Sequence, residues 1–187
     1  TGNPGIFSVR VLPLPKPILT DGAICVNASG SVIQNYLLDS GLGNLNHTFN
    51  WTFNGNPIPN SFQSTYLASV IGTYTVVATN TITGCVSSPA VSAIVSTANP
   101  AVSLYAYVEN NISNSASVTV VVNSGTGPFL YQLDNGPFQT SNVFTLVPSG
   151  LHTITVQDAF NCTNLKTSTL VIDFPNYFTP NGDNYND

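Results

Sequence analysis

The side chains that could support chemistry in this sequence are few and scattered. The chain has three cysteines, two histidines and eight acidic residues in 187 positions. Cys25, Cys85 and Cys162 form no CxxC pair, and with only His47 and His152 to join them a structural zinc site is not expected. There is no GxSxG elbow, and neither histidine has an acid or a nucleophile near it in the sequence. The sequence therefore predicts no catalytic, cofactor-binding or metal-ligating residues, and we expect a protein that is not an enzyme.

The charge balance excludes further classes of function. Only Arg10, Lys16 and Lys166 are basic, and the formal net charge is −5. Because so few cations cannot neutralise a phosphate backbone, no nucleic acid partner is expected. No stretch approaches the roughly 20 consecutive apolar residues of a membrane helix, so membrane insertion is not expected either. Asn, Ser and Thr supply the surface polarity, as is often seen in extracellular β-proteins, and without a start Met or a signal peptide we interpret the chain as a processed or excised piece.

The elements that must position these residues are β-strands. Apolar and polar residues alternate with period two throughout, β-branched residues are enriched, and no helical period occurs. Asn54-Gly55 and Asp134-Asn135-Gly136 are expected to form matching turns. The sequence thus predicts tandem antiparallel β-sandwiches. The expected strands are 22–27, 31–38, 47–53, 64–70, 72–80 and 88–96 in a first unit, and 101–109, 116–123, 128–134, 142–147, 150–158 and 167–174 in a second.

Internal repetition divides the chain into units. The segment that begins "GTYTVVATN" at Gly72 aligns with "GLHTITVQD" at Gly150, and each continues to a Cys and a last alternating strand. Residues 1–17 match the end of such a unit, so we expect there the last strand of an upstream repeat and a Pro-rich linker. The predicted domains are then 18–98 and 99–174, followed by residues 175–187 as a linker and the start of another domain.

The first unit carries a family resemblance. "WTFNGNPIP", with Trp51 in a core position, and the tyrosine-bearing "GTYTVVATN" are similar to two strands of immunoglobulin-like domains. The resemblance implies immunoglobulin-like antiparallel β-sandwiches. Cys25 and Cys85 bracket one repeat, so we predict a disulfide between them, although Cys85 lies further from Tyr74 than the second cysteine of antibody domains does. Cys162 has no counterpart of Cys25 in its own repeat, and it is either a free thiol or paired outside the fragment.

Two further positions are singled out in the second unit. His152 aligns with Tyr74, so we expect it at a strand corner with one ring nitrogen hydrogen-bonded. Tyr105 and Tyr107 share one face of a predicted strand. Core burial explains most aromatic residues on alternating positions, but this face is the best candidate for stacking on sugar rings.

The most specific motif is the closing stretch "FTPNGDNYND". It resembles the opening of the gliding-motility-associated C-terminal domain of Bacteroidetes proteins, which is the sorting signal for type IX secretion. The residues that carry the resemblance are Phe178, Thr179, Pro180, Asn181, Gly182, Asp183, Asn186 and Asp187. It implies export across the outer membrane by the type IX secretion machinery and an extracellular or cell-surface location. A physical alternative remains: Thr179-Pro180-Asn181-Gly182 is a turn sequence, and the Asp and Asn side chains around it more often cap their own turns. The oxygens of Asn181, Asp183, Asn186 and Asp187 could instead ligate calcium, although the EF-hand spacing is not met.

These observations predict a non-enzymatic extracellular stalk or spacer segment of a type IX secreted cell-surface protein, an adhesin linked to gliding motility or attachment. Its further partners would be surface glycans or other adhesin domains. The alternative is a carbohydrate-binding module of a secreted hydrolase. Short proline-containing linkers between units favour the spacer, because they restrict bending.

Overall fold

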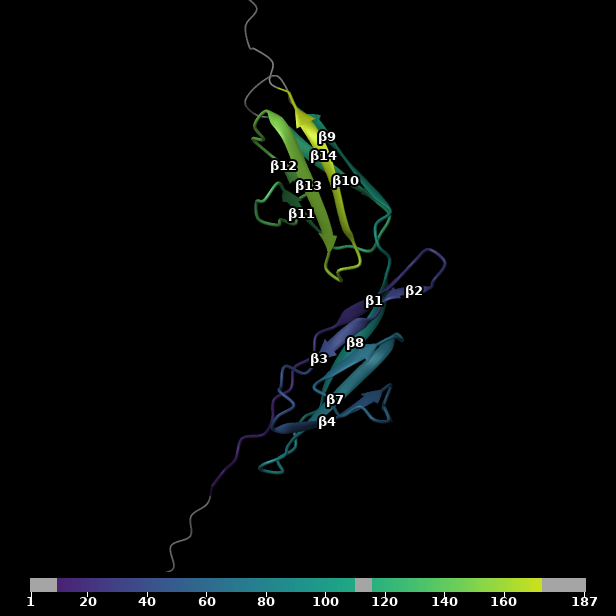
Figure 1. Ribbon diagram of the computed structural model, residues 1–187, viewed down its shortest axis with the longest axis vertical. Helices are drawn as coiled ribbons and strands as arrows, with labels where there is room; N and C mark the ends of the chain where they lie inside the picture. The colour runs from purple at the N-terminus through teal and green to yellow at the C-terminus, as the bar shows by residue number, and fades with distance from the viewer. Residues whose placement is uncertain (1–9, 110–115, 173–187) are drawn as a thin grey trace, which may run out of the picture. The chain divides into compact units, whose positions relative to one another are not determined.

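The computed structural model describes residues 10–109 and 116–172. Within them the fold is all β, and no helix is present (Figure 1). Two compact units are distinguished: of the described residues, the first contains 10–24 and 35–97, and the second contains 25–34, 98–109 and 116–172. The domain boundaries expected from the repeats stay a prediction.

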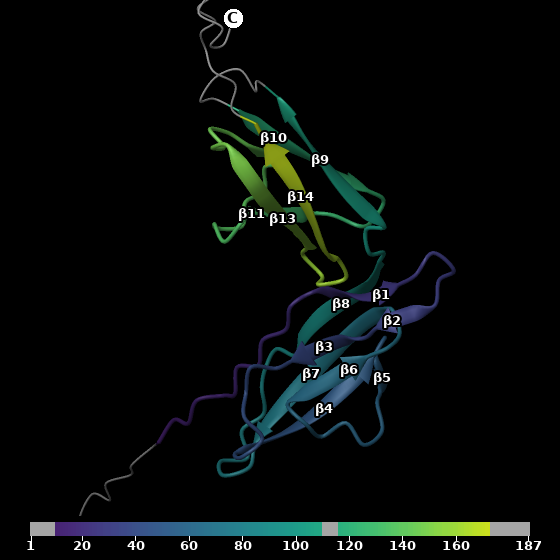
Figure 2. The ribbon, with the colours of Figure 1, turned by 45° about the horizontal axis from the view of Figure 1, so that its top comes forward.

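The first unit is built on two sheets. The larger sheet has the strand order β2-β1-β8-β7-β4-β5, and the smaller sheet has the order β3-β6. Within the larger sheet, β2 and the end of β1 are counted with the second unit. Figure 2 shows β7 between β4 and β8. The strands are β1 (Gly22–Val26), β2 (Val32–Gln34), β3 (Tyr36–Asp39), β4 (His47–Phe53), β5 (Asn56–Pro57), β6 (Thr65–Ala68), β7 (Gly72–Asn80) and β8 (Val91–Ala98).

The core of the first unit follows from the period-two pattern. Along β7 the buried residues are Tyr74, Val76 and Ala78, which alternate with more exposed ones, because successive side chains point to opposite faces of a sheet. Trp51 on β4 is fully buried, as expected, and its indole N–H donates to the carbonyl of Gln63 at 2.9 Å. The single polar atom of this large side chain is therefore satisfied inside the core.

The second unit is a sandwich of two three-stranded antiparallel sheets with the orders β12-β10-β9 and β11-β13-β14. Val118 and Val120 of one sheet and Ile154 and Val156 of the other belong to a single buried apolar cluster, so the sheets pack face to face (Figure 2). The strands are β9 (Ser103–Glu109), β10 (Ser117–Asn123), β11 (Phe129–Leu133), β12 (Val143–Phe144), β13 (Gly150–Asp158) and β14 (Asn164–Val171).

The fold class is the predicted one. Antiparallel sheets, a buried Trp on β4 and a tyrosine near the start of β7 whose hydroxyl bonds to the backbone four residues upstream are features of immunoglobulin-like sandwiches. Asn54 and Gly55 adopt positive φ angles of 47° and 82°, as a tight hairpin between β4 and β5 requires. The chain therefore consists of immunoglobulin-like β-sandwiches.

Two expected strands differ most from the structure, while the strands expected at 88–96 and 167–174 are displaced to β8 and β14 by two or three residues. The strand expected at 31–38 is split at Asn35, because β2 pairs with β1 whereas β3 pairs with β6 in another sheet. The strand expected at 142–147 shrinks to β12, since Leu146 takes a left-handed φ of 56° that extended strands do not allow. The expected strand within residues 1–17 lies mostly outside the described residues, and the described part has no strand.

Candidate functional site

The cysteines are paired differently from the prediction. Cys25 is bonded to Cys162, with a Cα–Cα distance of 5.4 Å and a sequence separation of 137 residues. Cys85 is a free, partly exposed thiol. The predicted Cys25–Cys85 bridge is therefore wrong, and Cys162, which the sequence left open, is the actual partner. Both bonded cysteines are counted in the second unit.

The strand arrangement explains why Cys25 and Cys85 cannot meet. Asn99, which follows β8, donates to the carbonyl of Val26 at 3.1 Å, so Cys25 lies at the C-terminal end of β8. The carbonyl of Cys85 accepts from Asn80 at 2.8 Å, and the antiparallel β7–β8 pairing puts this end of β7 beside the N-terminal end of β8. Eight residues of strand span about 25 Å. Disulfides need Cα atoms closer than about 7 Å.

The loop that presents Cys162 is fixed by a buried carboxylate. Oδ1 of Asp158 accepts hydrogen bonds from the backbone N–H groups of Phe160 at 2.8 Å and Cys162 at 2.9 Å. The next residue, Thr163, is buried and its hydroxyl accepts from the backbone N–H of Ala101 at 2.8 Å. Asp158 Oδ2 is buried without a protein partner. The turn before β14 is thus held at both sides of Cys162.

The His152 side chain occupies a strand corner between two acceptors. Its Nδ1 lies 2.8 Å from Oδ2 of Asp134, and its Nε2 lies 2.9 Å from the carbonyl oxygen of Pro148. A carboxylate and a carbonyl can only accept, so both ring nitrogens must donate, and only the protonated imidazolium has two N–H groups. The geometry therefore favours a charged His152.

The pKa shifts agree with this geometry. The hydrogen bond from Asp134 is the main cause that raises the pKa of His152 above 6.5, with burial opposing it. The same hydrogen bond, followed by one from the N–H of Thr153, lowers the pKa of Asp134 below 3.8. The side chain of His152 is 10% exposed and that of Asp134 is 47% exposed, so solvent screens the pair from one side.

The corner interpretation of His152 is supported by its counterpart. Tyr74 donates its hydroxyl to the carbonyl of Val70 at 2.8 Å, four residues upstream, as His152 does to Pro148. The partner Asp134 was missed from the sequence. The sequence feature that could have identified Asp134 is its position in the second predicted turn, which matches that of Asn54 in the first. Oδ1 of Asn54 accepts from the N–H of Thr73, and Oδ1 of Asp134 likewise accepts from the N–H of Thr153.

The hydrogen bond of the turn side chain is offset by two residues between the two units. Asn54 bonds to the residue directly after Gly72, whereas Asp134 bonds to the third residue after Gly150. The shift of two residues brings the turn side chain up to the corner ring. A histidine and a carboxylate therefore meet in the second unit, where the first unit has only a tyrosine corner.

The predicted glycan face lies on β9. The side chains of Leu104, Ala106 and Val108 pack against the core, so Tyr105 and Tyr107 point to the other side. The two residues are 50% and 42% exposed, and their ring centroids are 6.5 Å apart at an interplanar angle of 33°. The structure brings these two predicted residues together on one exposed sheet face.

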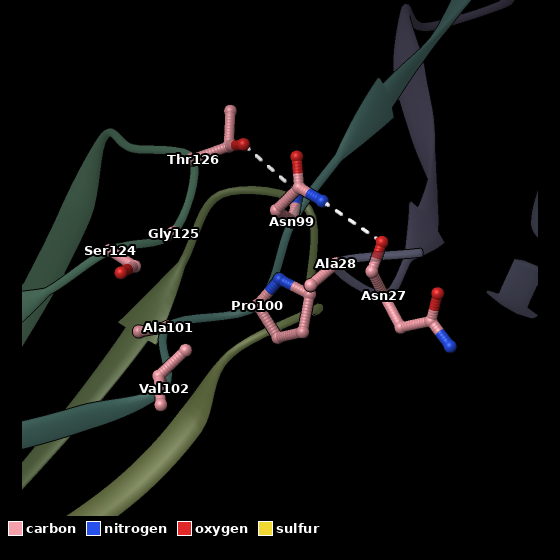
Figure 3. A pocket seen from close by; sticks show the side chains of 9 residues that line it. All are labelled: Asn27, Ala28, Asn99, Pro100, Ala101, Val102, Ser124, Gly125 and Thr126. Atoms are coloured by element: carbon pink, nitrogen blue, oxygen red, sulfur yellow. Dashed lines mark hydrogen bonds between the residues drawn. The ribbon is translucent and has the colours of Figure 1, made fainter. Parts of the chain in front are cut away.

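A pocket of about 540 Å³ opens within the second unit (Figure 3). Its wall is made of backbone, small side chains, amides and hydroxyls: the backbone N–H of Asn99 donates to the hydroxyl of Thr126 at 2.9 Å, and Asn99 Nδ2 donates to the carbonyl of Asn27 at 3.5 Å. None of its lining residues is titratable, so its wall offers no acid or base to activate the hydroxyls of Ser124 and Thr126. The lining residues are Asn27, Ala28, Asn99, Pro100, Ala101, Val102, Ser124, Gly125 and Thr126.

The described residues hold no group of three or more His, Cys, Asp or Glu side chains that could bind a metal ion. No helix among them is long and apolar enough to cross a membrane. The sorting motif at residues 178–187, with its alternative as a calcium site, lies outside the described residues.

Comparisons with known proteins give structural likeness only. No protein family and no curated protein matches the chain. Among solved structures, the CD2-binding domain of CD58 is 9% identical, with a TM-score of 0.43, over 83% of this chain and 98% of that one. The fibronectin(III)-like modules of Clostridium thermocellum CbhA are 12% identical, with a TM-score of 0.42, over 82% and 91%. Bovine butyrophilin is 6% identical, with a TM-score of 0.37, over 83% and 98%. Similarity this low carries no statement about function.

Proposed function

We propose that this chain is a spacer segment of a cell-surface adhesin that the type IX secretion machinery exports and that serves gliding motility or attachment. Immunoglobulin-like sandwiches fit a non-enzymatic extracellular spacer or adhesion module. A disulfide fits the same setting, because disulfides persist in oxidising compartments outside the cytosol. The motif at residues 178–187 supports the finer assignment by its resemblance to a type IX sorting domain.

The observation that carries the proposal is the architecture itself, in which immunoglobulin-like β-sandwich units follow one another along the chain. Within the described part of the chain, His152 and Asp134 form an ion pair that is used at a strand corner, where both ring nitrogens bond to the protein itself. Neither nitrogen is left to act on a substrate. This use of the pair within the fold supports a role in holding other parts of a protein.

The secretion test uses the complete gene in its own bacterium. Surface display would be measured by protease shaving of intact cells, in a strain with and a strain without the type IX machinery. We expect loss of surface protein and its retention inside the cell when the machinery is missing. The variant Asp183→Ala tests the motif, with Asp39→Ala as a matched change outside it. Undiminished display without the machinery would contradict the assignment.

A second candidate function is glycan binding by the tyrosine face. Two half-exposed rings on adjacent outward positions of β9 form a platform on which sugar rings could stack. Binding of the purified chain to a glycan array would test it. We expect Tyr105→Ala or Tyr107→Ala to weaken any saturable binding about fivefold, which corresponds to about 1 kcal/mol per ring. Phe62→Ala removes another exposed aromatic side chain and is the matched control. Binding equally weakened by Phe62→Ala would argue against this face.

A further inference from the structure

The covalent loop closed by Cys25 and Cys162 contains most of the chain. The bond joins residues 137 positions apart, so residues 26–161 lie inside the loop. These residues include all of β2 to β13 and thus the buried cluster strands β10 and β13. Among the strands of residues 10–109 and 116–172, only β14 and most of β1 lie outside it. A mechanical path from one end of the chain to the other can therefore pass through the disulfide without passing through residues 26–161.

We propose that the Cys25–Cys162 disulfide is a tension bypass, which keeps pulling force off residues 26–161. The proposal rests on the proposed spacer function, since a spacer between a surface and an attached target is pulled along its chain. Tension that enters before Cys25 crosses the sulfur–sulfur bond and leaves after Cys162. Because the two cysteines are covalently joined at a Cα–Cα distance of 5.4 Å, the loop between them cannot be stretched by force on the ends.

The segments next to the disulfide hold little length in reserve. Cys25 belongs to β1 (Gly22–Val26), and Cys162 stands just before β14 (Asn164–Val171). A strand rises about 3.2–3.4 Å per residue, close to the limit of about 3.3–3.6 Å for a fully extended chain. Both flanking elements are thus nearly extended already, and the force path is strand, disulfide, strand.

The fold also secures these two strands laterally. β14 pairs with β13 in an unbroken register from Gly150↔Val171 to Gln157↔Asn164. Asp21 Oδ1 accepts from the N–H of Ile94 at 2.7 Å just before β1 begins. The turn before β14 is held by Asp158, which bonds to the N–H of Cys162. The fold therefore holds both ends of the disulfide, with Cys25 near the end of β1 and Cys162 just before the start of β14.

Single-molecule force spectroscopy on the full 187-residue chain, with a handle at each end, tests the bypass. The Cys85→Ser variant would be used throughout, because the free thiol could exchange with the disulfide. In the oxidised chain we expect no extension step from residues 26–161. After dithiothreitol is added to the same folded molecules, stretching should release up to about 450–490 Å of additional contour, which is 137 residues at about 3.3–3.6 Å each.

The outcomes separate clearly. Because dithiothreitol is added to molecules that have already folded, the test does not depend on a variant that fails to fold. Combining Cys162→Ser with Cys85→Ser should release the same contour length without reductant. Long extension steps in oxidised molecules whose Cys25–Cys162 link is verified by peptide mapping would overturn the bypass, and so would absence of that link. Neither result bears on export, so failure of the bypass is distinguishable from failure of the secretion assay.

Discussion

The ion pair at the second strand corner makes stability of the second unit depend on pH. Folding raises the pKa of His152 through the hydrogen bond with Asp134. The stabilisation from His152 is therefore complete below its unfolded pKa of about 6.5 and is lost as the pH rises through the raised folded value. Folding lowers the pKa of Asp134, so its contribution is complete above about 3.9 and is lost as the pH falls through the lowered folded value. Stability from the pair should be greatest between about pH 4 and pH 6.5.

The magnitude follows from the exposure of the two partners. A hydrogen bond to a charged group contributes about 1.5–3 kcal/mol, whereas a fully exposed ion pair contributes about 0–1 kcal/mol. The His152 side chain is nearly buried but the Asp134 side chain is 47% exposed, which reduces the contribution through solvent screening. We expect the pH-dependent contribution of this pair to the free energy of unfolding to be about 1 kcal/mol.

The matched variant is His152→Tyr. Tyr74 shows that a tyrosine at this corner can donate to the carbonyl four residues upstream, and a tyrosine does not titrate near neutral pH. Urea unfolding at several pH values should show the stability loss above about pH 6.5 in the wild type and not in the variant. NMR titration of the His152 ring would give its pKa directly. A value at or below 6.5 would refute the reasoning.

Two other substitutions test single contacts. Tyr74→Phe removes the hydroxyl that donates to the carbonyl of Val70 and leaves that carbonyl unpaired, so it should lower the free energy of unfolding of the first unit by about 1 kcal/mol. Trp51 fluorescence follows the unfolding of this unit. An unchanged unfolding midpoint would argue that this hydrogen bond is dispensable. Asp158→Ala leaves two backbone N–H groups of the Cys162 turn without acceptors and should cost about 2 kcal/mol. Circular dichroism during denaturation measures the loss of stability, and we also expect faster reduction of the disulfide. A stabilised variant would show that burying Asp158 Oδ2 without a partner costs more free energy than the two hydrogen bonds contribute.

Most strands could be predicted because they depend on local pattern. Residues 47–53 and 72–80 alternate between buried and exposed sides, and the same ranges are β4 and β7. The Asn54-Gly55 turn could also be predicted, since few residues adopt two successive positive φ angles. The corner position of His152 followed from the repeat alignment with Tyr74.

The parts that could not be predicted depend on contacts between distant residues. Cys25 lies by the end of β8 that is away from Cys85, and it bonds to Cys162 in the turn before β14. Nothing near the three cysteines in the sequence encodes this arrangement. The meeting of His152 and Asp134 depends on a turn displaced by two residues, which an alignment of strands alone does not show. The break at Asn35 reflects a change of sheet, although the apolar pattern continues through it.

The covalent link between Cys25 and Cys162 is the feature on which this view of the spacer depends most directly. It is measured by alkylating the unreduced protein, digesting it and identifying the cysteine peptides by mass spectrometry. We expect one cross-linked pair that joins Cys25 to Cys162 and an alkylated Cys85. A Cys25–Cys85 peptide, or three alkylated cysteines, would contradict it.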